Sequence, residues 1–228
     1  MDRSLIDTTL TEIEDAFASD PDASLSGRQF WKAAGATKRD PELVKSFADR
    51  IAALDHEGFS RWAFLKIPLG IGTALALAGT AVGVALVGLA YSAAEPWNGI
   101  SLLVGMFVLF TTLHSLAHLV IGRMFGIRFT HWFVGTIGRP QPGVKIDYAT
   151  YLRTPAAQRA WMHAAGAMMS KAVPFLLIPA ALAADVPAWA LWALVGIGGV
   201  TITTDSLLSV KTGDWKKFKR EMALRDNR

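Results

Sequence analysis

The sequence predicts an all-α polytopic membrane protein with about four transmembrane helices, a small cytoplasmic β-ribbon and an N-terminal helical region. Hydrophobic residues make up 52% of the 228 positions, a share that soluble domains of this length rarely reach. These residues are concentrated in long runs, and a run of about 20 apolar residues can cross a hydrocarbon core. The composition therefore predicts a protein embedded in a lipid bilayer.

Charge divides the chain into an acidic and a basic part. Residues 1–60 hold 12 acidic and 7 basic side chains, a net charge of −5, whereas residues 61–228 hold 7 and 16, a net charge of +9. A basic excess beside apolar runs is typical of the cytoplasmic flanks of membrane helices, so we expect no nucleic-acid partner. Cysteine is absent, which excludes disulfides and thiolate metal sites.

Residues 1–60 are expected to form a cytoplasmic helical region. Residues 1–20 carry apolar side chains at helical spacing, and the Asp-Pro-Asp sequence at 20–22 ends that pattern. A second amphipathic stretch begins at Pro41, which suits a first helical turn, and continues to Leu54. A small helical cap is the simplest interpretation, and a partner-binding or regulatory role is the alternative.

The transmembrane core is predicted over residues 61–212. Its four nearly uncharged runs cover residues 67–90, 100–121, 161–184 and 188–210. The first run contains Gly79 and Gly83, a spacing that favours close helix packing. Basic residues precede the first run, crowd the 122–160 connection and follow the fourth run, whereas the other two connections lack them. The positive-inside rule then places both termini and the 122–160 segment in the cytoplasm.

Two shorter elements complete the predicted fold. Within residues 127–148, apolar and polar residues partly alternate on both sides of the Arg-Pro-Gln-Pro-Gly sequence at 139–143. This alternation indicates a β-ribbon with a turn. The tail, residues 213–228, spaces Trp215, Phe218 and Met222 among basic side chains. This pattern indicates an amphipathic helix that lies on the anionic leaflet.

The main functional signal is a histidine pair in the second run. His114 and His118 are four residues apart, so both imidazoles lie on one face of a helix and can chelate one metal ion. At the helical rise, His118 lies about 7–8 Å from Arg123, and Asp205 of the fourth run lies about 9 Å from Lys211 at the same membrane face. Two imidazoles and a carboxylate at matching depth are a typical catalytic zinc set, and we expect zinc.

The residues around this pair resemble the first core helix of the site-2 protease family of intramembrane zinc metalloproteases. The resemblance continues through Gly122–Phe129, and the ribbon falls where the family has a membrane-associated sheet. Ala165–Lys171 falls where the family carries a Gly-Pro and an Asn, and Asp205 where it places its third zinc ligand. The resemblance covers about residues 98–212 and implies a transmembrane or membrane-proximal peptide as substrate or partner.

Two departures from the family's pattern limit what the resemblance implies. Ser115 stands where the family has the glutamate that activates zinc-bound water, and a hydroxyl cannot accept that proton near neutral pH. The family's Gly-Pro and Asn are replaced by Gly166-Ala167 and Ser170-Lys171. The catalytic residues are therefore unknown. Two functions stay open, a divergent peptidase and a pseudoprotease that binds membrane protein segments without cutting them.

Two more polar residues of the third run are candidates for a second shell around the metal. His163 lies near the cytoplasmic end of that run and is a candidate ligand, second-shell donor or proton carrier; the alternative is a histidine bonded to backbone. Lys171 falls near mid-membrane and is expected to face the bundle interior or a water pocket, because a charge that faces lipid is costly.

Two other classes of protein fit the same residues. In a b-type haem protein, His114 or His118 would pair with His163 as axial ligands. In a structural membrane subunit without a metal, the polar residues would only pack helices.

Overall fold

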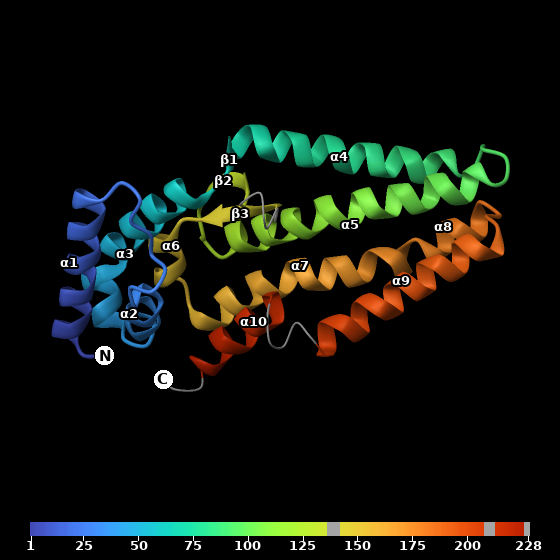
Figure 1. Ribbon diagram of the computed structural model, residues 1–228. Helices are drawn as coiled ribbons and strands as arrows, with labels where there is room; N and C mark the ends of the chain where they lie inside the picture. The colour runs from blue at the N-terminus through green and yellow to red at the C-terminus, as the bar shows by residue number, and fades with distance from the viewer. Residues whose placement is uncertain (136–141, 208–212, 226–228) are drawn as a thin grey trace. The chain divides into compact units, whose positions relative to one another are not determined.

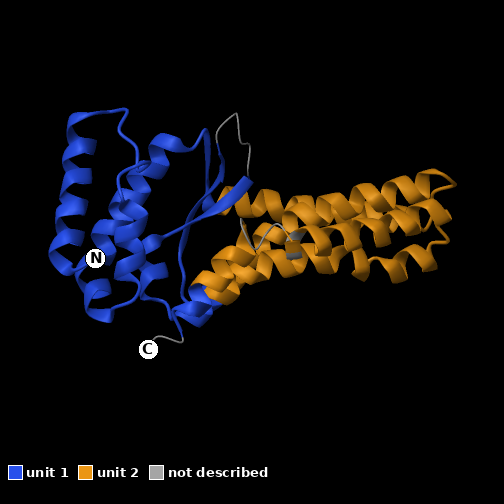
Figure 2. Cartoon of the chain, turned by 60° about the horizontal axis from the view of Figure 1, so that its bottom comes forward, with its two compact units in different colours: residues 1–69, 122–159, 221–228 blue, residues 70–121, 160–220 orange. Residues whose placement is uncertain are grey.

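The computed structural model of the chain describes residues 1–135, 142–207 and 213–225, without the side chains of Asp205 and Ser206. The described part is mostly helical and contains a small three-stranded antiparallel sheet (Figure 1). The predicted class, a helical membrane protein with a small β element, is confirmed. The chain divides into two compact units, unit 1 with residues 1–69, 122–159 and 221–228, and unit 2 with residues 70–121 and 160–220 (Figure 2).

Unit 1 is built on helices whose apolar faces share one core. They are α1 (Arg3–Ser19), α2 (Phe30–Thr37), α3 (Pro41–Trp62) and α6 (Tyr148–Arg153). The carboxylates of Asp2 and Asp40 accept hydrogen bonds from the first backbone N–H groups of α1 and α3, which fixes where both helices begin. The core contains the apolar residues that the helical spacing predicted: Ile6, Leu10, Ile13, Phe17, Val44, Phe47, Ile51 and Leu54.

The sheet of unit 1 has one more strand than the predicted ribbon. β2 (Phe129–Val134) and β3 (Pro142–Ile146) form the expected hairpin, and β1 (Leu65–Pro68) pairs with the other edge of β2 in the order β1-β2-β3. The first membrane run was predicted to begin at about residue 67. Residues 65–68 use their backbone groups in the sheet, and the helix begins at Leu69.

The predicted membrane runs are helical. Long and apolar enough to cross a membrane are α4 (Leu69–Leu89), α5 (Trp97–Met124) and the stretch Ala156–Ala183. The last of these contains α7 (Ala156–Leu176) and α8 (Ile178–Ala183), which are separated at Leu177. α9 (Ala188–Leu207) corresponds to the fourth run, and its apolar part Ala188–Thr204 is shorter than the other three. The chain is therefore a multi-pass membrane protein by the length and composition of its helices.

Small residues let α4 and α5 approach closely. A Cβ atom added at Gly105 would lie 2.8 Å from the Gly83 carbonyl oxygen, and one added at Gly83 would lie 2.8 Å from Leu109. Beside this contact, the Thr80 hydroxyl donates to the Thr112 hydroxyl at 3.0 Å. The close packing expected from Gly83 is thus confirmed, and its partner surface is on α5.

We predict that Gly105→Ala destabilises the protein by about 1–3 kcal/mol, because the new methyl group meets a backbone oxygen that cannot rotate away. Thermal unfolding in one detergent measures the effect. Gly88→Ala is the matched control, since an added Cβ at Gly88 has no neighbour within 4 Å; a helical glycine replaced by alanine in open space is neutral or stabilising. Equal shifts for the two variants would contradict the proposed contact.

A buried ion cluster in unit 1 fixes the end of the C-terminal helix, α10 (Asp214–Ala223). Glu221 accepts from Lys38 Nζ and from Arg159 Nε, both at 2.7 Å, and the three side chains are at most 5% exposed. Burial raises the pKa of Glu221, but the two cations outweigh it and hold the pKa at about 2. The sequence-based placement of this helix on the leaflet surface did not anticipate the buried carboxylate.

We predict that Glu221→Gln costs about 3–5 kcal/mol at pH 7, because it leaves two cations buried beside a neutral partner. The folded pKa of about 2 lies below the ordinary value of 4.5, so this stabilisation is complete above pH 4.5 and is lost as the pH falls toward 2. Unfolding curves from pH 7 to pH 2.5 should show the wild type and the variant converging. Glu42→Gln, in an exposed pair with Lys45, should behave like the wild type throughout.

Candidate metal site

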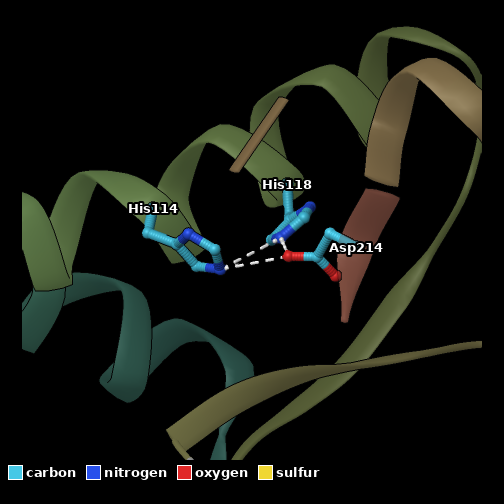
Figure 3. Close-up of side chains that lie close together, drawn as sticks. All are labelled: His114, His118 and Asp214. Atoms are coloured by element: carbon cyan, nitrogen blue, oxygen red, sulfur yellow. Dashed lines mark hydrogen bonds and ion pairs between the residues drawn. The ribbon is translucent and has the colours of Figure 1, made fainter. Parts of the chain in front are cut away.

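Helix α5 presents the two predicted histidines on one face. Their rings lie edge to face with centroids 4.8 Å apart, and the two Nε2 atoms are 3.3 Å apart. Figure 3 shows both imidazoles directed at the same point. Two imidazole nitrogens in this arrangement could be neighbouring ligands of one ion, whereas the axial ligands of a haem lie on opposite sides of the iron. His114 and His118 therefore do not fit as the two axial ligands of one haem, and the alternative that pairs one of them with His163 stays a prediction.

The third member of the group is Asp214, the first residue of α10. Its Oδ2 atom lies 3.2 Å from His118 Nε2 and 3.5 Å from His114 Nε2 (Figure 3). Gly213, which precedes it, has φ +83°, a conformation that other residues adopt at a cost. The turn at Gly213 directs the start of α10 toward α5. All three residues belong to unit 2, and together they could hold a metal ion.

The spacing of the three ligand atoms fits a tetrahedral ion. Nitrogen and oxygen ligands at 2.0–2.1 Å from a tetrahedral zinc ion lie about 3.4 Å from one another. The three observed separations are 3.2, 3.3 and 3.5 Å. In such a site, two histidines and one carboxylate would occupy three corners, and the fourth would be left for water or a substrate atom.

Hydrogen bonds from α7 fix the orientation of both imidazoles. His118 Nδ1 lies 2.7 Å from the Met162 carbonyl oxygen, which can only accept, so this nitrogen carries the proton. The Ser170 hydroxyl donates to the Gly166 carbonyl and therefore accepts from His114 Nδ1 at 2.8 Å. Both Nε2 lone pairs then face the Asp214 carboxylate, and three acceptors at this distance need a cation between them.

A proton is the alternative cation at this position. If His118 also carries a proton on Nε2, the imidazolium bonds Asp214 Oδ2. Burial raises the pKa of Asp214, but this bond, the His118 charge and Lys217 outweigh it and bring that pKa well below its usual range. Asp214 is thus ionised in either case. A proton satisfies the His118–Asp214 contact and leaves the lone pair of His114 facing the carboxylate.

Gly166 makes room for the His118 ring. A Cβ atom added at this glycine would lie 2.2 Å from His118 Nε2. Met162, Gly166 and Ser170 are spaced by four residues, so they form one face of α7. That face orients the two histidines without contributing a ligand of its own.

A cavity of about 300 Å³ adjoins the group. It is lined by residues of α5, α7, α9 and the start of α10, namely Phe110, His114, Ala167, Ser170, Lys171, Thr201, Thr204, Gly213 and Asp214. The Lys171 ammonium lies in this lining, donates to the Ala167 carbonyl at 3.1 Å and sits 5.0 Å from the centroid of Trp215. The Lys171 side chain thus faces a cavity among the helices of unit 2.

The other predicted site residues have different positions. Asp205 belongs to α9, but its side chain is outside the described residues, so its role as a ligand stays a prediction. His163 is buried at 5% exposed and is not a member of the group found among the described residues. Ser115 is buried at 7% exposed and lies about 100° around the helix from His114.

Sequence reasoning missed Asp214 because it searched for carboxylates only within the apolar runs. The usable signal was the pair Gly213-Asp214 between the fourth run and the amphipathic tail. Glycine at such a position allows the chain to reverse, and an acidic residue at a helix start is common.

No protein-family model matches this chain, and no curated protein or solved structure matches it significantly.

We predict that Gly166→Ala lowers metal affinity at least tenfold, because the methyl group displaces the His118 ring. Ser170→Ala should lower it about 10–100-fold, the usual effect of removing a hydrogen bond to a ligating histidine. Isothermal titration of the apoprotein with zinc measures both. Gly199→Ala is the control, since a Cβ there has no neighbour within 4 Å. Unchanged affinity in both α7 variants would show that this face does not orient the ligands.

Proposed function

We propose that this chain is a site-2-protease-like integral membrane protein that binds one zinc ion through His114, His118 and an aspartate. The observation that supports the proposal is the convergence of three acceptor atoms at tetrahedral spacing. Zinc is favoured because two imidazoles and a carboxylate are a standard ligand set for it, and because the set leaves one open corner. The basic flanks of the predicted runs support a site near the cytoplasmic face, with both termini in the cytoplasm.

When bound, zinc supplies Lewis acidity to whatever group occupies the open corner. Peptide hydrolysis also needs a group that accepts a proton from the attacking water, and Ser115 is no such group. The chain does have two aspartates near the fourth run, Asp205 and Asp214, for one ligand position. If Asp205 is the third ligand, as the resemblance implies, Asp214 is a carboxylate left beside the histidines as a proton acceptor. If Asp214 is the ligand, the base of a peptidase stays unknown, and the alternative is a pseudoprotease that binds peptide segments without cutting them.

Elemental analysis of detergent-purified protein tests the metal site. The wild type should contain about one zinc per chain, and His114→Ala/His118→Ala should contain less than a tenth of that, because one carboxylate cannot hold the ion alone. His163→Ala is the control, a buried histidine outside the group, and should keep its zinc. Metal-free wild-type protein, or zinc retained in the double variant, would overturn the proposal, and a Soret band would identify haem instead.

The two aspartates can be separated in the same experiment. Asp205→Ala and Asp214→Ala are compared. The variant that replaces the zinc ligand should lose zinc, and the other variant should retain it. Cleavage of a membrane-embedded reporter peptide is then compared among the zinc-bearing proteins. Loss of cleavage with zinc retained in Asp214→Ala identifies a peptidase with Asp214 as base. Cleavage that appears only in Ser115→Glu identifies a pseudoprotease.

A further inference from the structure

A second cavity lies within unit 1, independent of the candidate metal site. Its volume is about 900 Å³, within the range of small-molecule sites. Its walls come from the segment before α2, the start of α2, the last turns of α3 and the strands β2 and β3. These elements all belong to unit 1 (Figure 2, blue).

The wall formed by residues 24–29 is held in place by specific contacts. Gly58 of α3 leaves room for Leu25, because a Cβ at Gly58 would lie 2.6 Å from the Leu25 Cγ atom. Just before this wall in the chain, the Arg61 guanidinium donates to the carbonyls of Phe17, Asp20 and Pro21 at 2.8–3.0 Å. A wall that is held by the protein's own contacts lowers the entropic cost of binding.

Aromatic side chains cover much of the lining. They are Phe30, Trp31, Phe59, Trp62 and Phe133. Trp31 and Trp62 are 57% and 48% exposed. Trp31 packs edge to face on Phe30, and Trp62 packs edge to face on Phe133. Two half-exposed indoles on a preformed hollow provide stacking surfaces for a flat ligand.

An ion pair lines the same cavity. The Lys145 ammonium and the Asp55 carboxylate are 2.5 Å apart, and their side chains are only 15% and 5% exposed. Burial raises the pKa of Asp55, and Lys145 offsets this only in part. A buried ion pair contributes little to stability on balance. Perturbed ionisable groups in an aromatic hollow are a frequent property of binding sites.

These features together restrict the chemistry of the ligand. A lipid tail or a plain hydrocarbon ring would displace water from the ion pair. The hydrogen bonds that the pair makes to that water would be lost and not replaced, which is costly. A flat heterocycle with a donor and an acceptor on one edge can donate to Asp55, accept from Lys145 and stack on the indoles. Adenine and guanine both have such an edge, and stacking on aromatic side chains is a common way to bind bases.

We propose that the unit 1 cavity binds a planar nitrogen heterocycle of the purine kind, stacked on Trp31 and Trp62 and read at its edge by Asp55 and Lys145. The proposal does not rest on the metal site. It assigns unit 1 a ligand-binding role within a membrane protein.

Equilibrium dialysis of radiolabelled adenosine and guanosine against the full chain in lipid nanodiscs tests the proposal. At least one nucleoside should bind saturably with a Kd below 1 mM, and empty nanodiscs give the background. Dimethylation of the adenosine amine removes both of its N–H groups, so that analogue should bind at least fivefold more weakly than adenosine wherever adenosine binds. No saturable binding of either nucleoside would overturn the proposal.

Matched variants locate the binding. Asp55→Asn/Lys145→Gln keeps the shape of the pair without its charges and should weaken binding at least tenfold. Glu42→Gln/Lys45→Gln makes the same change in an exposed pair of the same helix and should have no effect. Trp31 is 57% exposed, and Trp31→Ala should weaken binding at least fivefold. Trp192→Ala, at a tryptophan that is 70% exposed in unit 2, should leave binding unchanged, and so should His114→Ala/His118→Ala. Binding unchanged by Trp31→Ala and the Asp55 pair would contradict the assignment.

Discussion

The candidate metal site depends on one constraint: three hydrogen-bond acceptors face the same point inside unit 2. Two imidazole lone pairs and a carboxylate oxygen repel one another unless a cation lies between them. The arrangement persists because α7 leaves the imidazoles no other orientation, since the Met162 carbonyl and the Ser170 hydroxyl occupy their remaining nitrogens. The helix that contributes no ligand therefore decides which atoms of the other helix can bind an ion.

Unit 1 uses buried charge in two different ways. Glu221 meets two cations and is fully enclosed, so its role is to hold the chain. Asp55 meets one cation beside a hollow with aromatic walls, so its hydrogen-bonding capacity faces a space large enough for a ligand. The contrast depends on what surrounds the carboxylate, because the ion pairs themselves are chemically alike.

Much of the architecture could be predicted from the sequence. Apolar runs gave α4, α5, α7 and α9 because length and composition decide whether a helix can span a bilayer. The spacing of His114 and His118 placed them on one face because helical periodicity is a local property. β1 was missed because its four residues continue into an apolar run and only their pairing with β2 makes them a strand. Asp214 and the unit 1 cavity were missed because both require segments distant in sequence to meet.

The close approach of Gly166 to His118 bears on how related proteins could be found from their sequences. The candidate metal site has a recognisable spacing in the sequence. His114 and His118 are four residues apart, Gly166 follows His118 by 48 residues, and Asp214 follows Gly166 by another 48. A pattern that demands the glutamate of a hydrolase would pass over such a chain. A pattern that demands the glycine would retain it, because a Cβ atom at that position would meet the His118 ring whatever residue stands between the histidines.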